Sequence, residues 1–369
     1  MMRIVLILLI GIHGVIHLFG FLKAFSIVEF NAISSPIPKT TGIIWLLSFL
    51  LFIITLILSI SNAGYFWLSG FLAVLISQGL IFSHWSDAKF GTIPNLIILL
   101  MAIVSYATFS FKNKISEERV KMLKNATIIN QKAITQNDLI NLPPVVQKWL
   151  TSSGILDKEP VSNVYLTQDI QLKMTPEQKD WNPGAAEQYF TVQPPAFNWS
   201  IHTQMNPILG VVGRDKLENG QGEMTIKLMS LISVANAKQN EKVNEATLQR
   251  YLAEIIWFPS AALSSNITWE PIDDQAAKAT MRIGKTTGSG TFHFDQNGQF
   301  LKFTAMRYKD AKDPKPTLWT ASALKTAERN GVKIPVELKA DWKLASGQWT
   351  WLKISIKDIR YNVEKMPVK

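Results

Sequence analysis

Four long apolar runs in the first 111 residues restrict the fold of this 369-residue chain more than any other feature of its sequence. Each run is about 20 residues long, which is the length an α-helix needs to cross a bilayer. The first run resembles the apolar core of a signal peptide, but it is too long and lacks a small-residue cleavage site. We therefore predict a four-helix transmembrane region over residues 1–111, with spans at Ile4–Leu22, Gly42–Ser61, Tyr65–Ser83 and Ile93–Phe111.

The basic residues that flank these spans predict which side of the membrane the chain ends face. An even number of spans puts both ends on one side, where six basic residues gather against three on the other. By the positive-inside rule the C-terminal part is then cytoplasmic, with an extracytoplasmic position as the alternative. The six are Arg3, Lys112, Lys114, Arg119, Lys121 and Lys124, and the three are Lys23, Lys39 and Lys89.

Two histidines lie inside the first predicted span. His13 and His17 are four residues apart, so they project from one face of a helix. Ionisable groups inside a membrane are costly and mark proton or metal sites in many proteins. Neutral imidazoles can also form hydrogen bonds between helices beside small residues. No third ligand is evident in the sequence, so the second interpretation is favoured and no metal site is assigned.

The charge of the chain limits the kinds of molecule that it is expected to bind. The chain holds 38 Lys+Arg against 28 Asp+Glu, a net charge of +10, and no cysteine, which excludes disulfides and thiolate metal sites. No P-loop, zinc-finger or RNA-binding pattern supports a nucleic-acid partner. We expect anionic membrane lipids as the partner. A basic juncture at residues 112–138, which follows the last predicted span, would contact them.

Residues 139–369 change from helical periodicity to clean alternation of apolar and polar residues. Such alternation predicts antiparallel strands that have one face packed against the core and one face exposed to solvent. Asn297-Gly298 between two such runs is a hairpin signal, and connections this short exclude parallel crossovers. About ten or eleven strands are expected, and a sheet of that length must curl to protect its edges. The main alternating runs begin near Val164, Phe197, Met224, Ala277 and Val336.

One helical segment, Arg250–Leu263, interrupts the strands. On a helical wheel its apolar residues form a broad stripe, whereas Arg250, Glu254 and Trp257 fall on the opposite side, and Pro259 ends the helix. The fold class is therefore a four-span α-helical bundle plus an α+β domain, an open or half barrel whose central helix packs in the concave face of the sheet. Trp257 either packs under a loop with Arg250 stacked on it or lies at the rim of a ligand mouth.

No catalytic constellation is present in the sequence. There is no Gly-x-Ser-x-Gly elbow, and residues 284–290 lack the spacing of a phosphate-binding loop. His202 and His293 both fall on the polar side of alternating strands. No catalytic residue and no cofactor is assigned, and an enzyme would need clustered carboxylates beside one of these histidines.

The candidate ligand-binding residues are those that the alternating pattern of the strands does not explain. Arg214, Asp215, Arg250 and Glu254 could form a buried charge network that holds the helix in the sheet. Alternatively, they form a polar mouth that anchors the headgroup of a ligand. Trp199 and Trp257 are the aromatic candidates for the same mouth.

Three segments resemble those of a bacterial family of membrane-associated proteins of unknown function: PPAFNW from Pro194, GRDKLENGQGEM from Gly213 and RYLAEIIWFPSAAL from Arg250. The resemblance covers roughly residues 139–310, and HWSDAKFGTIPN at His84–Asn95 is similar to longer members. It implies the cytoplasmic membrane of a bacterium and adds no activity. A curled sheet with an inserted helix is similar to the lipoprotein-carrier fold of bacterial envelopes.

These observations favour a membrane-anchored binding protein whose curled-sheet domain holds an apolar or amphipathic, lipid-like ligand near the bilayer. The alternative is a structural or sensory membrane protein whose domain binds an unidentified protein and holds no small ligand. A packed interior without an apolar pocket would favour this alternative. Enzymatic activity is the least favoured interpretation.

Overall fold

The computed structural model describes residues 2–28, 34–61, 63–127, 132–205 and 209–364. The chain forms two compact units, and each is described by itself. Unit 1 comprises Met1–Lys114 and Met229–Leu231, and unit 2 comprises Ile115–Leu228 and Ile232–Lys369. Residues 128–131 of the predicted juncture lie outside the described residues.

Unit 1 contains the four predicted helices. Each of α1 (Met2–Ala24), α2 (Lys39–Ile60), α3 (Phe66–Ser83) and α5 (Thr92–Lys124) is long and apolar enough to cross a membrane, which confirms the predicted four-helix architecture. The short helices α4 (Trp85–Ala88) and η1 (Lys89–Gly91) precede α5. The helix α5 extends well beyond the predicted end of its apolar run, and its last turns belong to unit 2.

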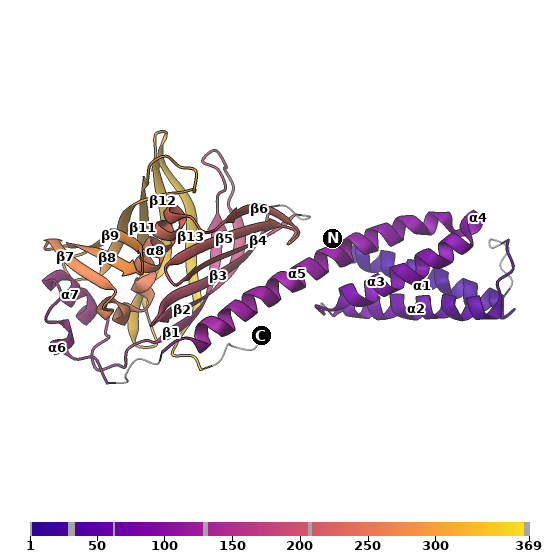
Figure 1. Ribbon diagram of the computed structural model, residues 1–369, viewed down its shortest axis with the longest axis horizontal. Helices are drawn as coiled ribbons and strands as arrows, with labels where there is room; N and C mark the ends of the chain where they lie inside the picture. The colour runs from indigo at the N-terminus through magenta and orange to yellow at the C-terminus, as the bar shows by residue number, and fades with distance from the viewer. Residues whose placement is uncertain (1, 29–33, 62, 128–131, 206–208, 365–369) are drawn as a thin grey trace. The chain divides into compact units, whose positions relative to one another are not determined.

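Unit 2 is organised by one antiparallel sheet (Figure 1). The sheet has 13 strands, two or three more than expected, in the order β6-β5-β4-β3-β2-β1-β13-β12-β11-β10-β9-β8-β7. The strands are β1 (Asn163–Leu172), β2 (Asn182–Val192), β3 (Pro195–Gln204), β4 (Gly210–Glu218), β5 (Gln221–Leu228), β6 (Ile232–Ala237), β7 (Ile267–Asp273), β8 (Ala276–Ile283), β9 (Thr286–Phe294), β10 (Phe300–Arg307), β11 (Thr317–Arg329), β12 (Val332–Leu344) and β13 (Gly347–Tyr361).

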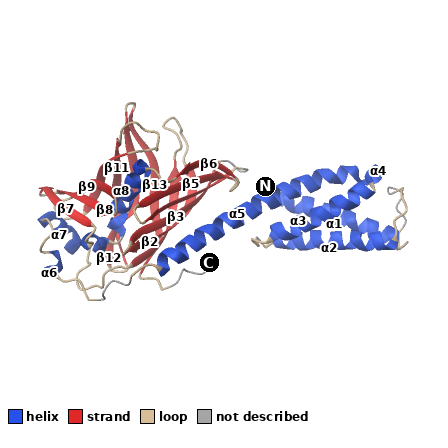
Figure 2. Cartoon of the chain, viewed as in Figure 1, coloured by secondary structure: helices blue, strands red, loops and turns tan. Residues whose placement is uncertain are grey.

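Consecutive strands pair throughout the sheet, except β6 and β7. The first and last strands, β1 and β13, pair in its middle, and β6 and β7 form its two edges. The segment between β6 and β7 contains α8 (Glu241–Glu254), η2 (Ile255–Trp257) and η3 (Pro259–Leu263). Figure 2 shows α8 inside the curve of the strands, so the predicted curled sheet with a helix in its concave face is confirmed.

Two strand glycines allow α8 to approach the sheet. A Cβ atom on Gly222 of β5 would lie 2.3 Å from Thr247 Oγ1, and one on Gly288 of β9 would lie 3.2 Å from the Gln249 backbone nitrogen. The first contact is closer than real Cβ atoms show and the second is tight, so glycine at both positions gives the helix room to cross these strands. The helices α6 (Gln136–Leu139) and α7 (Pro144–Ser152) precede the sheet, and Trp149 of α7 packs on Phe292 and Phe294 in the main core.

The central helix begins and ends earlier than its apolar pattern predicts. Asn240 caps it by accepting hydrogen bonds from the backbone amides of Lys242 and Val243, and the α-helix ends at Glu254. From Ile255 the chain continues as 3₁₀ turns, which have three residues per turn and invalidate the 3.6-residue wheel. Trp257 therefore lies in the core, 1% exposed, where its Nε1 donates to Pro335 O at 3.1 Å. Its predicted position on the charged side of the helix is wrong.

The end of α5 lies on the opposite face of the sheet from α8. Arg119 is buried there, with Nη1 3.1 Å from Glu187 Oε2, Nε donating to Asn198 Oδ1 at 3.1 Å, and its guanidinium 4.9 Å from the Tyr189 ring centroid. Nη2 also donates to Ser200 Oγ at 2.6 Å. These partners alternate along β2 and β3 with Gln188, Phe197 and Trp199, which face α8. They therefore lie on the face of the sheet that points away from α8. Arg119 thus joins the last turns of α5 to β2 and β3.

Candidate ligand-binding site

Four of the six predicted site residues meet between α8 and the inner face of the sheet. Asp215 on β4 pairs with Trp199 on β3, so both side chains lie on one face, and Arg250 and Glu254 are one turn apart on α8. We call Asp215, Arg250, Glu254 and Trp199, with Gln168 and Gln188 from β1 and β2, the inner-face network.

Arg250 is the centre of the inner-face network. Its Nη1 lies 2.7 Å from Asp215 Oδ2, and its Nε lies 2.9 Å from Glu254 Oε1. Its guanidinium also lies 4.8 Å from the ring centroid of Trp199 and 5.0 Å from that of Phe197. The stacking partners of Arg250 are Trp199 and Phe197, and not Trp257 as one interpretation of the sequence predicted. A planar, always-charged guanidinium suits this combination of two carboxylates and an aromatic surface.

Two glutamines extend the network along the sheet. Gln188 Nε2 donates to Glu254 Oε2 at 2.7 Å, and Gln168 Nε2 donates to Gln188 Oε1 at 3.4 Å. Trp199 Nε1 donates to Gln168 Oε1 at 2.9 Å. The hydrogen bonds therefore return to the tryptophan on which Arg250 stacks. Such mutual satisfaction is what makes a buried polar cluster stable.

A second arginine lies beside this network without a carboxylate of its own. Arg307 on β10 donates from Nε to Ala246 O at 2.9 Å, and its guanidinium lies 4.7 Å from the Trp319 ring centroid. Among the described residues, no carboxylate lies within salt-bridge distance of it. Burial, reinforced by the positive charge of Arg250, lowers the pKa of Arg307 to about 10. The negative charges of Asp215 and Glu254 oppose this decrease, and the guanidinium is still protonated at neutral pH.

Burial also governs the two carboxylates. It raises the pKa of Asp215 and of Glu254, and the positive charge of Arg250 opposes the increase in both. The network is not completely buried, because the side chain of Asp215 is 25% exposed to solvent.

An apolar surface adjoins the network through Trp199. On the inner face, Ile170, Leu172, Ala186 and Ile201 form a buried cluster against which half-buried side chains pack, namely Trp199, Trp351, Leu352 and Ile354. We call these eight residues the inner apolar patch. Polar groups that converge beside a largely apolar surface are typical of sites for amphipathic molecules.

The structure separates the other two predicted residues from this site. Arg214 precedes Asp215 on β4 and therefore faces the opposite side of the sheet, where it is 2% exposed and pairs with Glu118 at 3.4 Å and Glu223 at 3.0 Å. Its predicted grouping with Asp215, Arg250 and Glu254 is wrong, because adjacent strand residues point to opposite faces. Trp257 lies in the core, as described above.

Sequence reasoning missed Gln168, Gln188 and Arg307. Gln168 had a readable signal, because it occupies an inward position in the series Val164, Leu166, Ile170 and Leu172, where every other member is apolar. A polar residue at a core position must find a buried partner. Gln188 and Arg307 had no such signal, since their partners come from distant strands and from α8.

The two histidines of α1 form hydrogen bonds to neighbouring helices. His13 Nε2 lies 2.9 Å from Asn95 Oδ1, and His17 Nε2 lies 2.8 Å from Ser77 Oγ. Asn95 Nδ2 donates to Ser77 Oγ at 2.9 Å, which joins α1, α3 and α5. The described residues contain no group of three or more His, Cys, Asp or Glu that could hold a metal. Of the other three histidines, His84 Nδ1 lies 3.2 Å from Leu80 O, His202 is exposed on β3, and His293 Nε2 lies 3.1 Å from Thr304 Oγ1.

Comparisons with known proteins identify a family but no activity. The model of a family of unknown function (DUF6920) matches residues 140–361, which include the three segments on which the sequence resemblance rests. Among solved structures, a LolA superfamily protein from Nitrosomonas europaea is similar, with 10% identity and a TM-score of 0.31, covering 64% of this chain and 96% of that chain. No curated protein matches the chain.

Proposed function

Since this chain belongs to a family of unknown function (DUF6920), we propose its function from the site itself: it is a membrane-anchored binding protein that holds an amphipathic, lipid-like ligand on the inner face of its sheet. The polar part of the ligand would meet Arg250 and Arg307, and the apolar part would lie on the inner apolar patch. Asp215, Glu254 and Trp199 would position Arg250.

The observation that carries this proposal is the position of Trp199. Its ring stacks under Arg250 in the inner-face network and also packs against the buried cluster of the inner apolar patch. A cationic and an apolar surface are therefore contiguous, as an amphiphile with an anionic headgroup requires. Arg307 strengthens the case, because this buried cation has no carboxylate in salt-bridge distance among the described residues.

The membrane half supplies the anchor in this proposal. The four helices and a net charge of +10 fit an integral protein of a bacterial cytoplasmic membrane whose basic residues meet anionic lipids. The count of flanking basic residues favours a cytoplasmic position for the sheet domain, with the extracytoplasmic side as the alternative.

A second candidate function has its own support. The core between α8 and the sheet is tightly filled, and Tyr251, Trp257 and Phe258 of the central segment are fully buried in it. A domain filled in this way is suited to presenting a surface to another protein. The alternative is therefore a structural or sensory membrane protein that binds a protein partner and no small ligand.

Native mass spectrometry of the full chain, released from a mild detergent, separates the two. The lipid proposal expects an added mass that disappears after organic extraction. Ile354→Lys, which places a charge on the inner apolar patch, should abolish that mass. The adjacent Ser355→Lys is the matched control, because Ser355 is exposed on the other face of β13 and its variant should keep the ligand. A bare chain that also ignores added lipids would favour the protein-binding alternative.

A further inference from the structure

The two edges of the sheet differ in how they are protected. Edge strands of soluble proteins commonly carry charged residues or proline, which prevent pairing with other chains. The edge strand β7 has this protection, with Glu270, Pro271 and Asp273. The edge strand β6, of sequence ISVANA, contains no charged residue and no proline. Ile232 and Val234 of β6 are 62% and 60% exposed, so this edge presents apolar side chains that need a cover.

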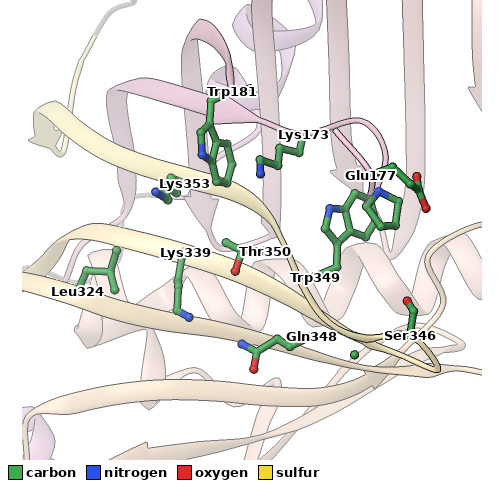
Figure 3. A pocket seen from close by; sticks show the side chains of 12 residues that line it. Lys173, Glu177, Trp181, Leu324, Lys339, Ser346, Gln348, Trp349, Thr350 and Lys353 are labelled. Atoms are coloured by element: carbon green, nitrogen blue, oxygen red, sulfur yellow. The ribbon is translucent and has the colours of Figure 1, made fainter. Parts of the chain in front are cut away.

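The turn between β5 and β6 is apolar as well. It comprises Met229–Leu231, and Leu231 is 43% exposed. A turn of the same sheet that faces water has a different composition, because Figure 3 shows the polar side chains Ser346 and Gln348 where β12 turns into β13. A contiguous run of exposed apolar residues marks a surface that contacts something other than water.

The position of this turn identifies what covers it. Residues Met229–Leu231 belong to unit 1, together with the apolar part of α5. Within that unit, Thr108 Oγ1 of α5 donates to Ser230 Oγ at 2.9 Å, and Ser230 is 3% exposed. Thr108 lies inside the predicted span Ile93–Phe111, and the span ends about 4.5 Å further along the helix axis. The turn is therefore held at the level at which α5 leaves the apolar layer.

An aromatic belt marks the same level of unit 1. Tyr106 and Phe109, on either side of Thr108, contact Trp67 of α3 with ring centroids 4.9 Å and 5.9 Å apart. Tyr65 lies 5.3 Å from Phe109 and is 61% exposed. Tyrosine and tryptophan gather where the hydrocarbon layer meets the lipid headgroups. This belt and the bond to Thr108 both put the turn at the membrane interface.

We propose that the β5–β6 turn and the start of β6 dock on the lipid bilayer, with Leu231, Ile232 and Val234 among the headgroups and the first acyl carbons. The partner is the bilayer because the turn is bonded to a helix at the depth where that helix meets the headgroups. The unpaired backbone groups of a sheet edge cannot enter the hydrocarbon core, so the contact is confined to the interface. This inference rests on the membrane anchor of the proposed function and not on its ligand.

Nitroxide labelling of the full chain in phosphatidylcholine nanodiscs tests this contact. The chain contains no cysteine, so a variant with one introduced cysteine carries a single label. Oxygen concentrates in the bilayer and a water-soluble nickel complex is excluded from it, so the ratio of their collision rates with the label reports immersion. This ratio should be several-fold higher for Ile232→Cys than for Ile272→Cys. Ile272 is the matched control, because it is 54% exposed on β7, the protected edge.

A reference position separates failure of the contact from failure of the anchor. Leu75, in the middle of α3, is 71% exposed, and Leu75→Cys should give the oxygen-rich value of the bilayer. A label at Leu75→Cys that the nickel complex reaches freely would contradict the membrane anchor itself. If Leu75→Cys reads as bilayer and the ratio for Ile232→Cys is as low as that for Ile272→Cys, the hairpin does not contact lipid and the inference is wrong.

A charge on the edge strand gives an independent check. Val234→Asp gives β6 the kind of residue that protects β7, and it should lower the ratio measured at Ile232→Cys. Ile272→Asp adds the same charge at the other edge and should leave that ratio unchanged. Low collision rates with both reagents at Ile232→Cys, together with spectral broadening between labels, would assign the edge to a second copy of this chain and overturn the contact with lipid.

Discussion

Arg250 combines two ion pairs and two aromatic contacts at one guanidinium, so its removal has a large expected effect. Arg250→Ala would leave Asp215 and Glu254 as adjacent, mostly buried carboxylates without their cation. Breaking a buried pair costs roughly 3–5 kcal/mol, and the partial exposure of Asp215 points to about 3 kcal/mol. Urea denaturation of the full chain in detergent, followed by tryptophan fluorescence, measures this loss.

The control for that measurement is Arg282→Ala. Arg282 is exposed on β8, and its Nε donates to Thr287 Oγ1 at 3.3 Å, so the variant should stay within about 0.5 kcal/mol of wild type. An unchanged urea midpoint in Arg250→Ala, together with loss of the ligand in mass spectrometry, would show that Arg250 contacts the ligand and does not stabilise the fold.

His293 predicts a pH dependence of stability. Burial, followed by the positive charge of Lys302, lowers the pKa of His293 below 6.5. Between that lowered pKa and about 6.5, the folded chain binds fewer protons at this residue than the unfolded chain does. Stability that is present above this window is therefore lost as the pH falls through it. His293→Gln should lose less stability than wild type between pH 7.5 and 5.5 in urea denaturation. Parallel losses in both proteins would contradict this assignment.

Among the elements, strands were easier to predict than the segment that packs inside them. Alternation identified the two faces of β1, β3 and β12, because a strand residue's face depends only on its parity. The same rule, applied to Arg214 and Asp215, would have separated them. The conformation after Glu254 was not predictable, since the partner of Trp257 in the 3₁₀ segment, Pro335, lies far along the chain. Gln168 could have been recognised, and Arg307 could not.

The last turns of α5 are an element whose stability depends on one side chain. Arg119→Ala would remove the contacts to Glu187, Asn198 and Ser200. Amide hydrogen exchange of residues 115–124 should then accelerate at least ~10-fold, which corresponds to about 1.4 kcal/mol. Lys121→Ala, at an exposed position of the same helix, should leave exchange unchanged. Equal exchange in both variants would show that other contacts hold the helix end.

At the scale of the whole molecule, composition and periodicity predicted the four helices and the curled antiparallel sheet. They did not predict the number of strands. The strand β6 carries exposed apolar residues such as Ile232 and Val234 at a sheet edge, so its residues do not alternate in burial. The pairing of β1 with β13 joins residues from opposite ends of the domain, which no local pattern reports.

The orientation of the molecule in the membrane is a prediction that fusions can test. With both ends cytoplasmic, a C-terminal green fluorescent protein fusion should fluoresce, and a C-terminal alkaline phosphatase fusion should be inactive. Fusions to the loop between α1 and α2 should give the reverse result. An active C-terminal phosphatase would place the sheet domain outside the cytoplasm.

The pairing of β1 with β13 also determines how this domain can fold. Every other strand pair joins neighbours along the chain, so β1–β6 and β7–β13 can each assemble from local hairpins. The pairing of β1 with β13, which aligns Val164 with Tyr361, forms only when the two ends of the domain meet. This closes the whole domain as a loop, at a large cost in chain entropy. We therefore expect the two half-sheets to form early and to join late, when β1 pairs with β13. A circular permutant that begins at α8 and links the old ends would turn the sheet into one continuous series of neighbours and should fold faster.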